Sequence, residues 1–255
     1  SIRFKGEDNM IFIEPGAHYK LNFWREWESA VPLLYIEEEI NGNLNTRIDS
    51  FKIELARLVS SFLPLRRGIP PKLDSSLTAL EKRHLQEGRP YLNNYIKYRI
   101  ALVQQMTFRK KMTQFNEKYI IGQPVLEDHD LYVEFIDQYF SNYLIGLTLQ
   151  ADAELVMKCI NESSNLEILF SVMNKDQRLA NDTLREFVLI KGLFEAYHHP
   201  DFEKEKVLVL LNKIASNTKY DKHKELVADV IFSLTYLKPG YAAPDFELYN
   251  IKGKL

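Results

Sequence analysis

The sequence is short of cysteine, glycine and net charge. Cys159 is the single cysteine among 255 residues, so neither an internal disulfide nor a two-thiol redox cycle is available to this chain. Glycine numbers ten, against fifteen phenylalanines and fourteen tyrosines, and this balance favours packed helices over a loop-rich or disordered chain. The formal net charge is −2, from 33 basic and 35 acidic side chains, which argues against a nucleic acid or an anionic membrane surface as the main partner.

Motifs of known chemistry are also missing. No apolar run approaches the ~20 residues of a membrane span. There is no G-x-S-x-G, no Walker loop, no H-E-x-x-H and no dinucleotide glycine fingerprint. Acidic residues surround His129 in "LEDHDL", but a zinc or calcium site needs further ligands, so we interpret them as the start of a helix. We therefore expect no catalytic residue, no cofactor and no metal in this chain.

Cys159 lies in "AELVMKCINE", which has a helical pattern. A lone cysteine in such a pattern is usually a small buried apolar side chain. No histidine or cationic pocket that would activate a thiol is evident around it. We expect Cys159 to be buried and unreactive.

Apolar residues recur at helical spacing through most of the chain. The predicted fold class is mainly α: an irregular array of about eight helices, with a short antiparallel β segment at the N-terminus and an extended C-terminal tail. No fixed repeat period is present, so a helical solenoid is not expected. The side chains predicted to be largely buried are Tyr95, Leu102, Phe135, Phe140, Leu193 and Leu234.

Three segments are predicted along the chain. Residues 1–39 alternate apolar and polar side chains, as strands do, and we interpret them as the remnant of an N-terminal β domain. Residues 40–238 form the helical domain. Residues 239–255 form a linker and the first strand of a further domain.

Several helix boundaries follow from capping residues. Ser164 with Glu167, and Thr183 with Glu186, predict capping boxes for helices at 166–173 and 183–197. Pro90 predicts the start of the longest helix, which we expect to continue to about residue 119.

Aromatic residues supply a candidate interaction surface. Tyr91, Tyr95 and Tyr98 recur on one helix face, and they fit either a peptide groove or a core face whose hydroxyl groups reach the rim. Trp24 and Trp27 fit either packing of strands onto helices or a protein interface. Both alternatives stay open.

The last residues, "PGYAAPDFELYNIKGKL", differ from the helical region. Gly240 frees the chain after the last helix, and Pro244 holds Ala243 extended. Phe246 then begins a strand-like alternation, and Gly253 supplies a positive φ in a predicted hairpin turn. These residues are patterned to join a sheet.

This segment resembles the entry to a thioredoxin-like domain of the peroxiredoxin-related type, as in the AhpC/TSA family and the TlpA-like thiol–disulfide oxidoreductases. The resemblance covers the last 17 of 255 residues. In these families a Cys-x-x-Cys or a peroxidatic cysteine follows the entry strand, so the resemblance implies a redox centre downstream of it. Cys159 lies upstream and matches no redox position of the family. The matching residues are Gly240, Ala243, Pro244, Asp245, Phe246, Leu248, Gly253 and Lys254.

The order of "EPGAHYKLNF", a helical region and "AAPDFEL" is also similar to larger envelope thioredoxin-like proteins with an N-terminal β domain and a helical insert. The resemblance implies a periplasmic or cell-envelope protein, exported by a targeting segment outside this sequence. It implies a non-catalytic accessory region that positions a protein or peptide partner, or the thioredoxin-like domain itself. One alternative is a free-standing helical protein- or peptide-binding module. Another is an enzyme whose carboxylates meet only in the fold.

Overall fold

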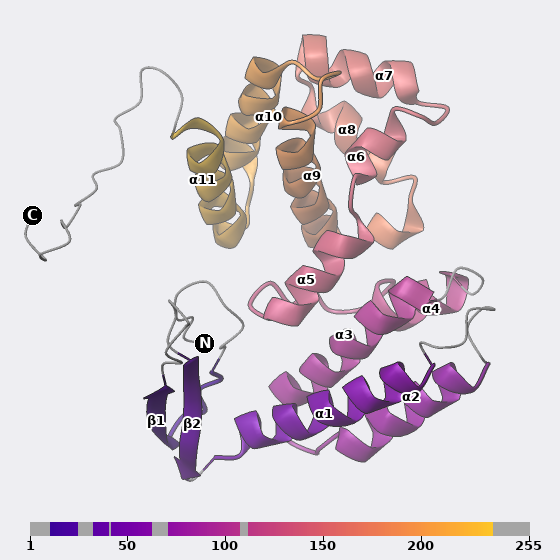
Figure 1. The fold of residues 1–255 in the computed structure, drawn as a ribbon. Coiled ribbons are helices and arrows are strands. Elements are labelled where there is room, and N and C mark those ends of the chain that lie inside the picture. Colours follow the sequence, from indigo (N-terminus) through magenta and orange to yellow (C-terminus); the bar gives the residue numbers. More distant parts are fainter. Residues whose placement is uncertain (1–10, 25–32, 41, 63–70, 108–111, 237–255) are drawn as a thin grey trace, which may run out of the picture. The chain divides into compact units, whose positions relative to one another are not determined.

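The computed structural model describes residues 11–24, 33–40, 42–62, 71–107 and 112–236 (Figure 1). The predicted fold class is confirmed: the protein is mainly α, with a small antiparallel sheet near the N-terminus. The predicted extended tail lies outside the described residues. The α-helices in the described part are α1 (Leu44–Phe62), α2 (Pro71–His84), α3 (Pro90–Thr107), α4 (Met112–Tyr119), α5 (Asp130–Tyr139), α6 (Tyr143–Leu147), α7 (Ala153–Lys158), α8 (Leu166–Met173), α9 (Asp182–Tyr197), α10 (Lys204–Asn217) and α11 (Asp221–Thr235).

The chain divides into two compact units. Unit 1 consists of Ser1–Lys110 and Glu127–Phe135, and unit 2 consists of Lys111–Leu126 and Ile136–Leu255. The segments predicted from sequence, with boundaries at residues 39 and 238, stay a prediction.

Unit 1 begins with a two-stranded antiparallel ribbon, β1 (His18–Trp24) and β2 (Leu33–Ile40). The register shifts between Lys20, which pairs with Glu38, and Leu21, which pairs with Ile36. Glu37 is therefore the extra residue of a β-bulge. Its carboxylate accepts a hydrogen bond from Asn22 Nδ2 at 2.7 Å and lies 2.9 Å from Lys20 Nζ.

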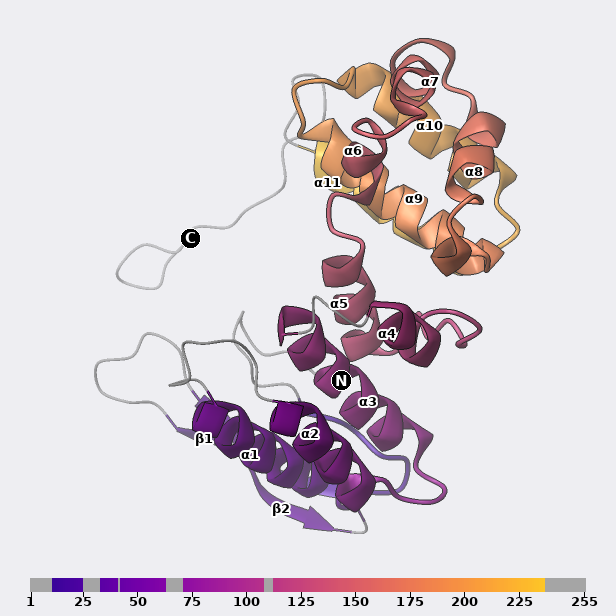
Figure 2. The same cartoon turned by 90° about the vertical axis from the view of Figure 1, so that its right-hand side faces the viewer.

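Helices α1, α2 and α3 pack side by side in unit 1 (Figure 2). Each has apolar residues three or four positions apart, and this stripe faces the core. Tyr95, Leu102 and Phe135 are buried, as predicted. Fully buried side chains of this unit include Ile48, Phe51, Leu77, Leu80, Ile96 and Tyr98.

The predicted helix from residue 90 to about 119 is wrong, because it is two helices, α3 and α4. Met106 keeps the helical spacing of the stripe but is 84% exposed, so the buried part of the stripe ends before it. Phe115 of α4 stacks on Tyr139 in unit 2, with ring centroids 5.8 Å apart. The two halves of the predicted helix thus bury their apolar residues in different units.

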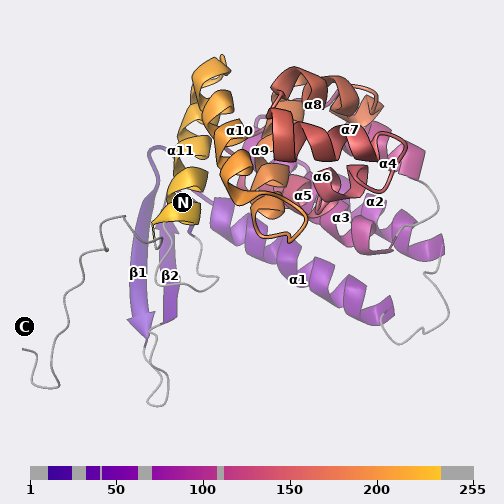
Figure 3. The same cartoon turned by 90° about the horizontal axis from the view of Figure 1, so that it is seen from above.

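Helix α9 is the centre of unit 2 and packs against α6, α10 and α11 (Figure 3). Leu193 of α9, Phe140 and Leu234 are buried, as predicted. The α9 residues enclosed by these neighbours are Leu184, Val188, Leu189, Ile190, Gly192, Leu193, Ala196 and Tyr197.

Both predicted capping boxes are wrong. The N-caps are Asn165, whose Oδ1 accepts from Glu167 N and Ile168 N, and Asn181, whose Oδ1 accepts from Leu184 N. Asparagine is as effective an N-cap residue as serine or threonine. Each polar run before a helix therefore contains more than one possible N-cap. Ser164 instead takes a left-handed conformation, with φ 48°, after the π-helical turn Cys159–Ser163.

A buried histidine–carboxylate pair joins α9 to α11. His223 is 1% exposed, and its Nδ1 lies 2.6 Å from Glu186 Oε1. The same oxygen accepts a hydrogen bond from Thr218 Oγ1. Glu186 therefore connects α9 to α11 and to Thr218, and it does not form the predicted capping box.

A guanidinium–aromatic cluster lies around Arg178, in the 3-10 turn Gln177–Leu179. Arg178 Nε and Nη2 donate to the Asp176 carboxylate over 2.5–3.0 Å, and Nη1 donates to the Tyr139 hydroxyl at 3.2 Å. The guanidinium carbon lies 5.5–5.8 Å from the ring centroids of Tyr139, Phe140 and Tyr143. One cation thus satisfies a carboxylate and contacts three aromatic rings.

Gly192 and Gly146 offer a matched pair of substitutions. A Cβ added to Gly192 would lie 2.7 Å from Leu144 Cβ, whereas a Cβ added to Gly146 would have no atom within 4 Å. We expect Gly192→Ala to lower the free energy of unfolding by about 1–3 kcal/mol through overpacking. Gly146→Ala should raise it by about 0.4–1 kcal/mol by restricting the unfolded chain. Urea denaturation of both variants measures this difference, and equal effects would contradict the close packing of α6 on α9.

Candidate functional site

A cleft of about 530 Å³ lies within unit 1, bounded by residues 12–15, Leu44, residues 88–92, Asp128 and Asp130. This volume is typical of a ligand site. Ile13 is 51% exposed, and Asp128 and Asp130 are exposed, so the cleft is open to solvent. Its apolar wall consists of Phe12, Ile13, Pro15, Leu44, Pro90, Tyr91 and Leu92.

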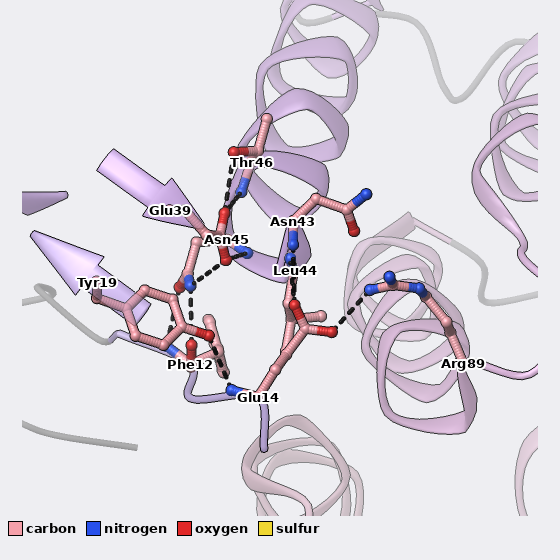
Figure 4. A network of polar contacts seen from close by, with 9 residues as sticks. All are labelled: Phe12, Glu14, Tyr19, Glu39, Asn43, Leu44, Asn45, Thr46 and Arg89. Atoms are coloured by element: carbon pink, nitrogen blue, oxygen red, sulfur yellow. Dashed lines mark hydrogen bonds and ion pairs between the residues drawn. The ribbon is translucent and has the colours of Figure 1, made fainter. Parts of the chain in front are cut away.

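Two carboxylates hold the N-terminus of α1 beside this cleft (Figure 4). Glu14 Oε2 accepts hydrogen bonds from the backbone N–H groups of Asn43 and Leu44, at 2.9 and 3.0 Å. Glu39, near the end of β2, accepts from the next two N–H groups, those of Asn45 and Thr46, each at 3.3 Å. The first N–H groups of a helix have no partner within it, so the two carboxylates satisfy them and complement the positive end of α1.

Glu39 and Asn45 fix the chain on both sides of this helix end. Burial alone would raise the pKa of Glu39, but hydrogen bonds from the side chains and backbones of Asn45 and Thr46 outweigh it and lower that pKa. The Asn45 side chain accepts from Phe12 N and donates to Phe12 O, both at 2.8 Å. Phe12 is thereby placed in the cleft wall.

Arg89 stands at the start of α3 and is tied to the same carboxylate. Its Nη1 donates to Glu14 Oε1 at 2.8 Å (Figure 4). Glu14 therefore joins three segments: the loop before β1, which contains residue 14, the start of α1 and the start of α3. Gly42 permits this approach, because a Cβ there would lie 2.8 Å from Glu14 Oε2 and 2.9 Å from Ala17 Cβ.

His129 links the start of α5 to the start of α3. Its ring stacks on Tyr91 with centroids 4.5 Å apart, and its Nε2 donates to the Tyr91 carbonyl oxygen at 3.2 Å. Burial lowers the pKa of His129, which favours the neutral ring. His129 is thus a structural residue that fixes the two helix ends lining the cleft, consistent with the expected helix start at this position.

The tyrosine stripe predicted from sequence is divided by the structure. Tyr91 is half-buried and lines the cleft, whereas Tyr95 and Tyr98 are 5% and 0% exposed and belong to the core. Burial raises the pKa of Tyr95 to about 12. The stripe is therefore no continuous open groove, and Tyr91 is its one member at the cleft.

The remaining predicted residues fall in several places. Trp24 ends β1, but its side chain is outside the described part, as is all of Trp27. Cys159 is 1% exposed and its Sγ donates to Asn165 O at 2.8 Å, as expected of a buried thiol. The tail residues that carry the family resemblance lie outside the described residues: Gly240, Ala243, Pro244, Asp245, Phe246, Leu248, Gly253 and Lys254.

No protein-family model, curated protein or solved structure matches this chain. Within the described ranges, no group of three or more histidine, cysteine, aspartate or glutamate side chains is arranged to hold a metal ion. None of the helices in that part of the chain is both long and apolar enough to cross a bilayer.

The two partly buried carboxylates of the described structure with a shifted pKa, Glu39 and Asp176, each have structural partners of their own. Glu39 caps α1 in unit 1, and Asp176 pairs with Arg178 in unit 2. In both residues hydrogen bonds lower the pKa despite burial. Both are structural carboxylates.

Sequence reasoning missed Glu14, Glu39 and Arg89 as residues that build the cleft. Glu14 lies in "EPGAH", which reads as a turn, and its partners Leu44 and Arg89 are 30 and 75 positions away. The sequence gives one weak indication, Asn43 before the apolar run. This residue predicts a helix start, but it does not indicate which distant residue caps the helix.

Proposed function

We propose that this chain is the non-catalytic helical accessory region of a cell-envelope thiol–disulfide oxidoreductase, and that it holds a protein or peptide partner for the thioredoxin-like domain. The observation that carries this proposal is the sequence pattern Gly240, Ala243-Pro244-Asp245-Phe246 and Gly253, which resembles the entry to such a domain. Periplasmic or envelope localisation follows from the same resemblance.

The surroundings of Cys159 support a non-catalytic role. Thiol–disulfide exchange begins with attack by an accessible thiolate on a disulfide sulfur. Cys159 is 1% exposed, and its thiol donates a hydrogen bond to the Asn165 carbonyl oxygen beside the π-helical turn. In this proposal the redox chemistry of the parent protein belongs to a thioredoxin-like domain downstream of this region.

A redox assay tests this role directly. We expect the 255-residue chain to reduce insulin no faster than buffer, because its one thiol is enclosed, while thioredoxin under the same conditions serves as the positive control. Cys159→Ser should match the parent chain. Activity that is present in the parent chain and lost in Cys159→Ser would overturn the non-catalytic role.

The coding sequence that follows residue 255 tests the parent assignment. We expect it to encode a Cys-x-x-Cys or a single reactive cysteine soon after the entry strand. A downstream domain without cysteine would overturn the oxidoreductase assignment.

The second candidate function is a free-standing helical protein- or peptide-binding module. The observation that favours it is the open cleft of unit 1, in which an apolar wall adjoins Arg89, Asp128 and Asp130. The two functions share a binding role and differ in the redox domain, so the downstream sequence separates them.

A further inference from the structure

The cleft of unit 1 combines an apolar wall with an excess of acidic groups. Its lining holds three carboxylates, those of Glu14, Asp128 and Asp130, and one guanidinium, that of Arg89. The Arg89 charge is matched by Glu14, since their nearest atoms are 2.8 Å apart. Asp130 adds a negative charge to this matched pair, and a cationic group complements it, whereas an anionic group does not.

Asp130 is the acidic group best placed to receive that cation. It is exposed at the first position of α5, and its carboxylate makes no ion pair or hydrogen bond with any residue that the structure describes. Its negative charge acts on the adjoining wall: burial, and then the charge of Asp130, raise the pKa of Tyr91. Asp130 and Tyr91 both line the cleft, so the lining offers a charged group and an aromatic ring.

Arg89 adds hydrogen-bond donors to the same cleft. Of the five guanidinium N–H groups, the described contacts use the Nη1 side on Glu14, and this ion pair holds the planar group in position. The remaining donors suit carbonyl oxygen atoms. A peptide backbone supplies such acceptors, whereas a simple amine supplies the cation and no acceptor.

We propose that this cleft binds an extended peptide segment in which a lysine or arginine is adjacent to an aromatic or large aliphatic residue. The basic side chain pairs with Asp130, the apolar side chain packs on Ile13 and Tyr91, and backbone carbonyl groups accept from Arg89. This inference rests on the proposed partner-binding role and adds the place and the class of ligand. Because the cleft is open to solvent, an extended segment can continue beyond it at both ends.

Capped peptides test the inference on the 255-residue chain. The probe is acetyl-Gly-Phe-Lys-Gly-amide, which has no terminal charge, and the comparison peptides carry Glu for Lys or Gly for Phe. Amide NMR titration gives the binding site and the Kd. We expect the Phe-Lys peptide to shift signals at residues 12–15, 88–92 and 128–130, and to bind about tenfold more tightly than either comparison peptide.

Two helix-start aspartates provide matched variants. Asp130 and Asp221 are the first residues of α5 and α11, and both are exposed. Asp130→Asn should weaken the Phe-Lys peptide about three- to tenfold, whereas Asp221→Asn should leave its Kd unchanged. Asp130→Lys should reverse the preference, so that the Phe-Glu peptide binds better than the Phe-Lys peptide.

Four other outcomes would contradict the inference that the cleft binds such a peptide. Equal effects of the two Asn variants, signal shifts confined to unit 2, or no shift at millimolar peptide would overturn the inference, while the redox assay and the downstream coding sequence still judge the proposed function separately. n-Butylammonium binding as tightly as the peptide would show a small-amine site and overturn the peptide class.

Discussion

Replacing His223 by alanine should lower the free energy of unfolding by about 3–5 kcal/mol. His223 is 1% exposed and its partner Glu186 has a side chain that is 13% exposed, with 2.6 Å between Nδ1 and Oε1. Removing the imidazole leaves a carboxylate in a largely dry environment with Thr218 as its hydrogen-bond donor. Thermal and urea denaturation, followed by circular dichroism, measure the loss.

Two controls distinguish the unpaired carboxylate from a simple loss of packing. Lys224 follows His223 in α11 and forms an exposed ion pair with Asp221. Lys224→Ala should lower the free energy of unfolding by no more than about 1 kcal/mol. The double variant His223→Leu with Glu186→Met removes both polar partners, so it should be more stable than His223→Ala. A double variant less stable than His223→Ala would refute this explanation.

Replacing Arg178 by alanine should lower the free energy of unfolding by about 2–4 kcal/mol, because it removes charge-assisted hydrogen bonds to Asp176 and contacts with three aromatic rings. Arg178→Lys keeps the charge but loses the planar fork, and should recover only part of this energy. Lys175→Ala is the control, since its ion pair with Asp152 is exposed and should contribute at most about 1 kcal/mol.

The same cluster predicts a pH dependence with a defined sign. Burial would raise the pKa of Asp176, but hydrogen bonds from Arg178, its charge and a hydrogen bond from Tyr143 outweigh burial and lower that pKa. A carboxyl group with a lowered folded-state pKa stabilises the fold above its unfolded pKa, and this contribution is lost as the pH falls through the folded pKa. Urea midpoints should therefore fall less between neutral and acidic pH in Arg178→Ala than in the parent chain. An identical acid dependence would argue against this pair.

The apolar pattern predicted the helical class and the core, because burial of a helix stripe depends on local spacing. Leu102 and Leu193 are buried for this reason, as expected. Pattern could not predict where α3 ends, since Met106 continues the spacing of the stripe and yet is 84% exposed. Which unit receives an apolar residue depends on long-range packing, and spacing contains no information about it.

The candidate site was less accessible to sequence reasoning than the fold. Tyr91 was singled out by its place in an aromatic stripe, but Tyr95 and Tyr98, with the same spacing, are core residues. Glu14 and Glu39 cap α1 from segments outside that helix, so no local capping motif in the sequence predicts their role. Asp130 was interpreted as part of a helix start, which it is, and its place in the cleft wall depends on α3 and residues 12–15 packing beside it.

The position of Glu14 in the chain also sets an order of events on the ribosome. Leu44 and Arg89 follow Glu14 by 30 and 75 residues. At ~5–20 residues per second, they emerge about 2–6 s and about 4–15 s after it. The start of α1 can therefore be capped by Glu14 while Arg89 is still unsynthesised. Because Asp128 and Asp130 are translated later still, the cleft is completed only after α1, α2 and α3 have all been synthesised.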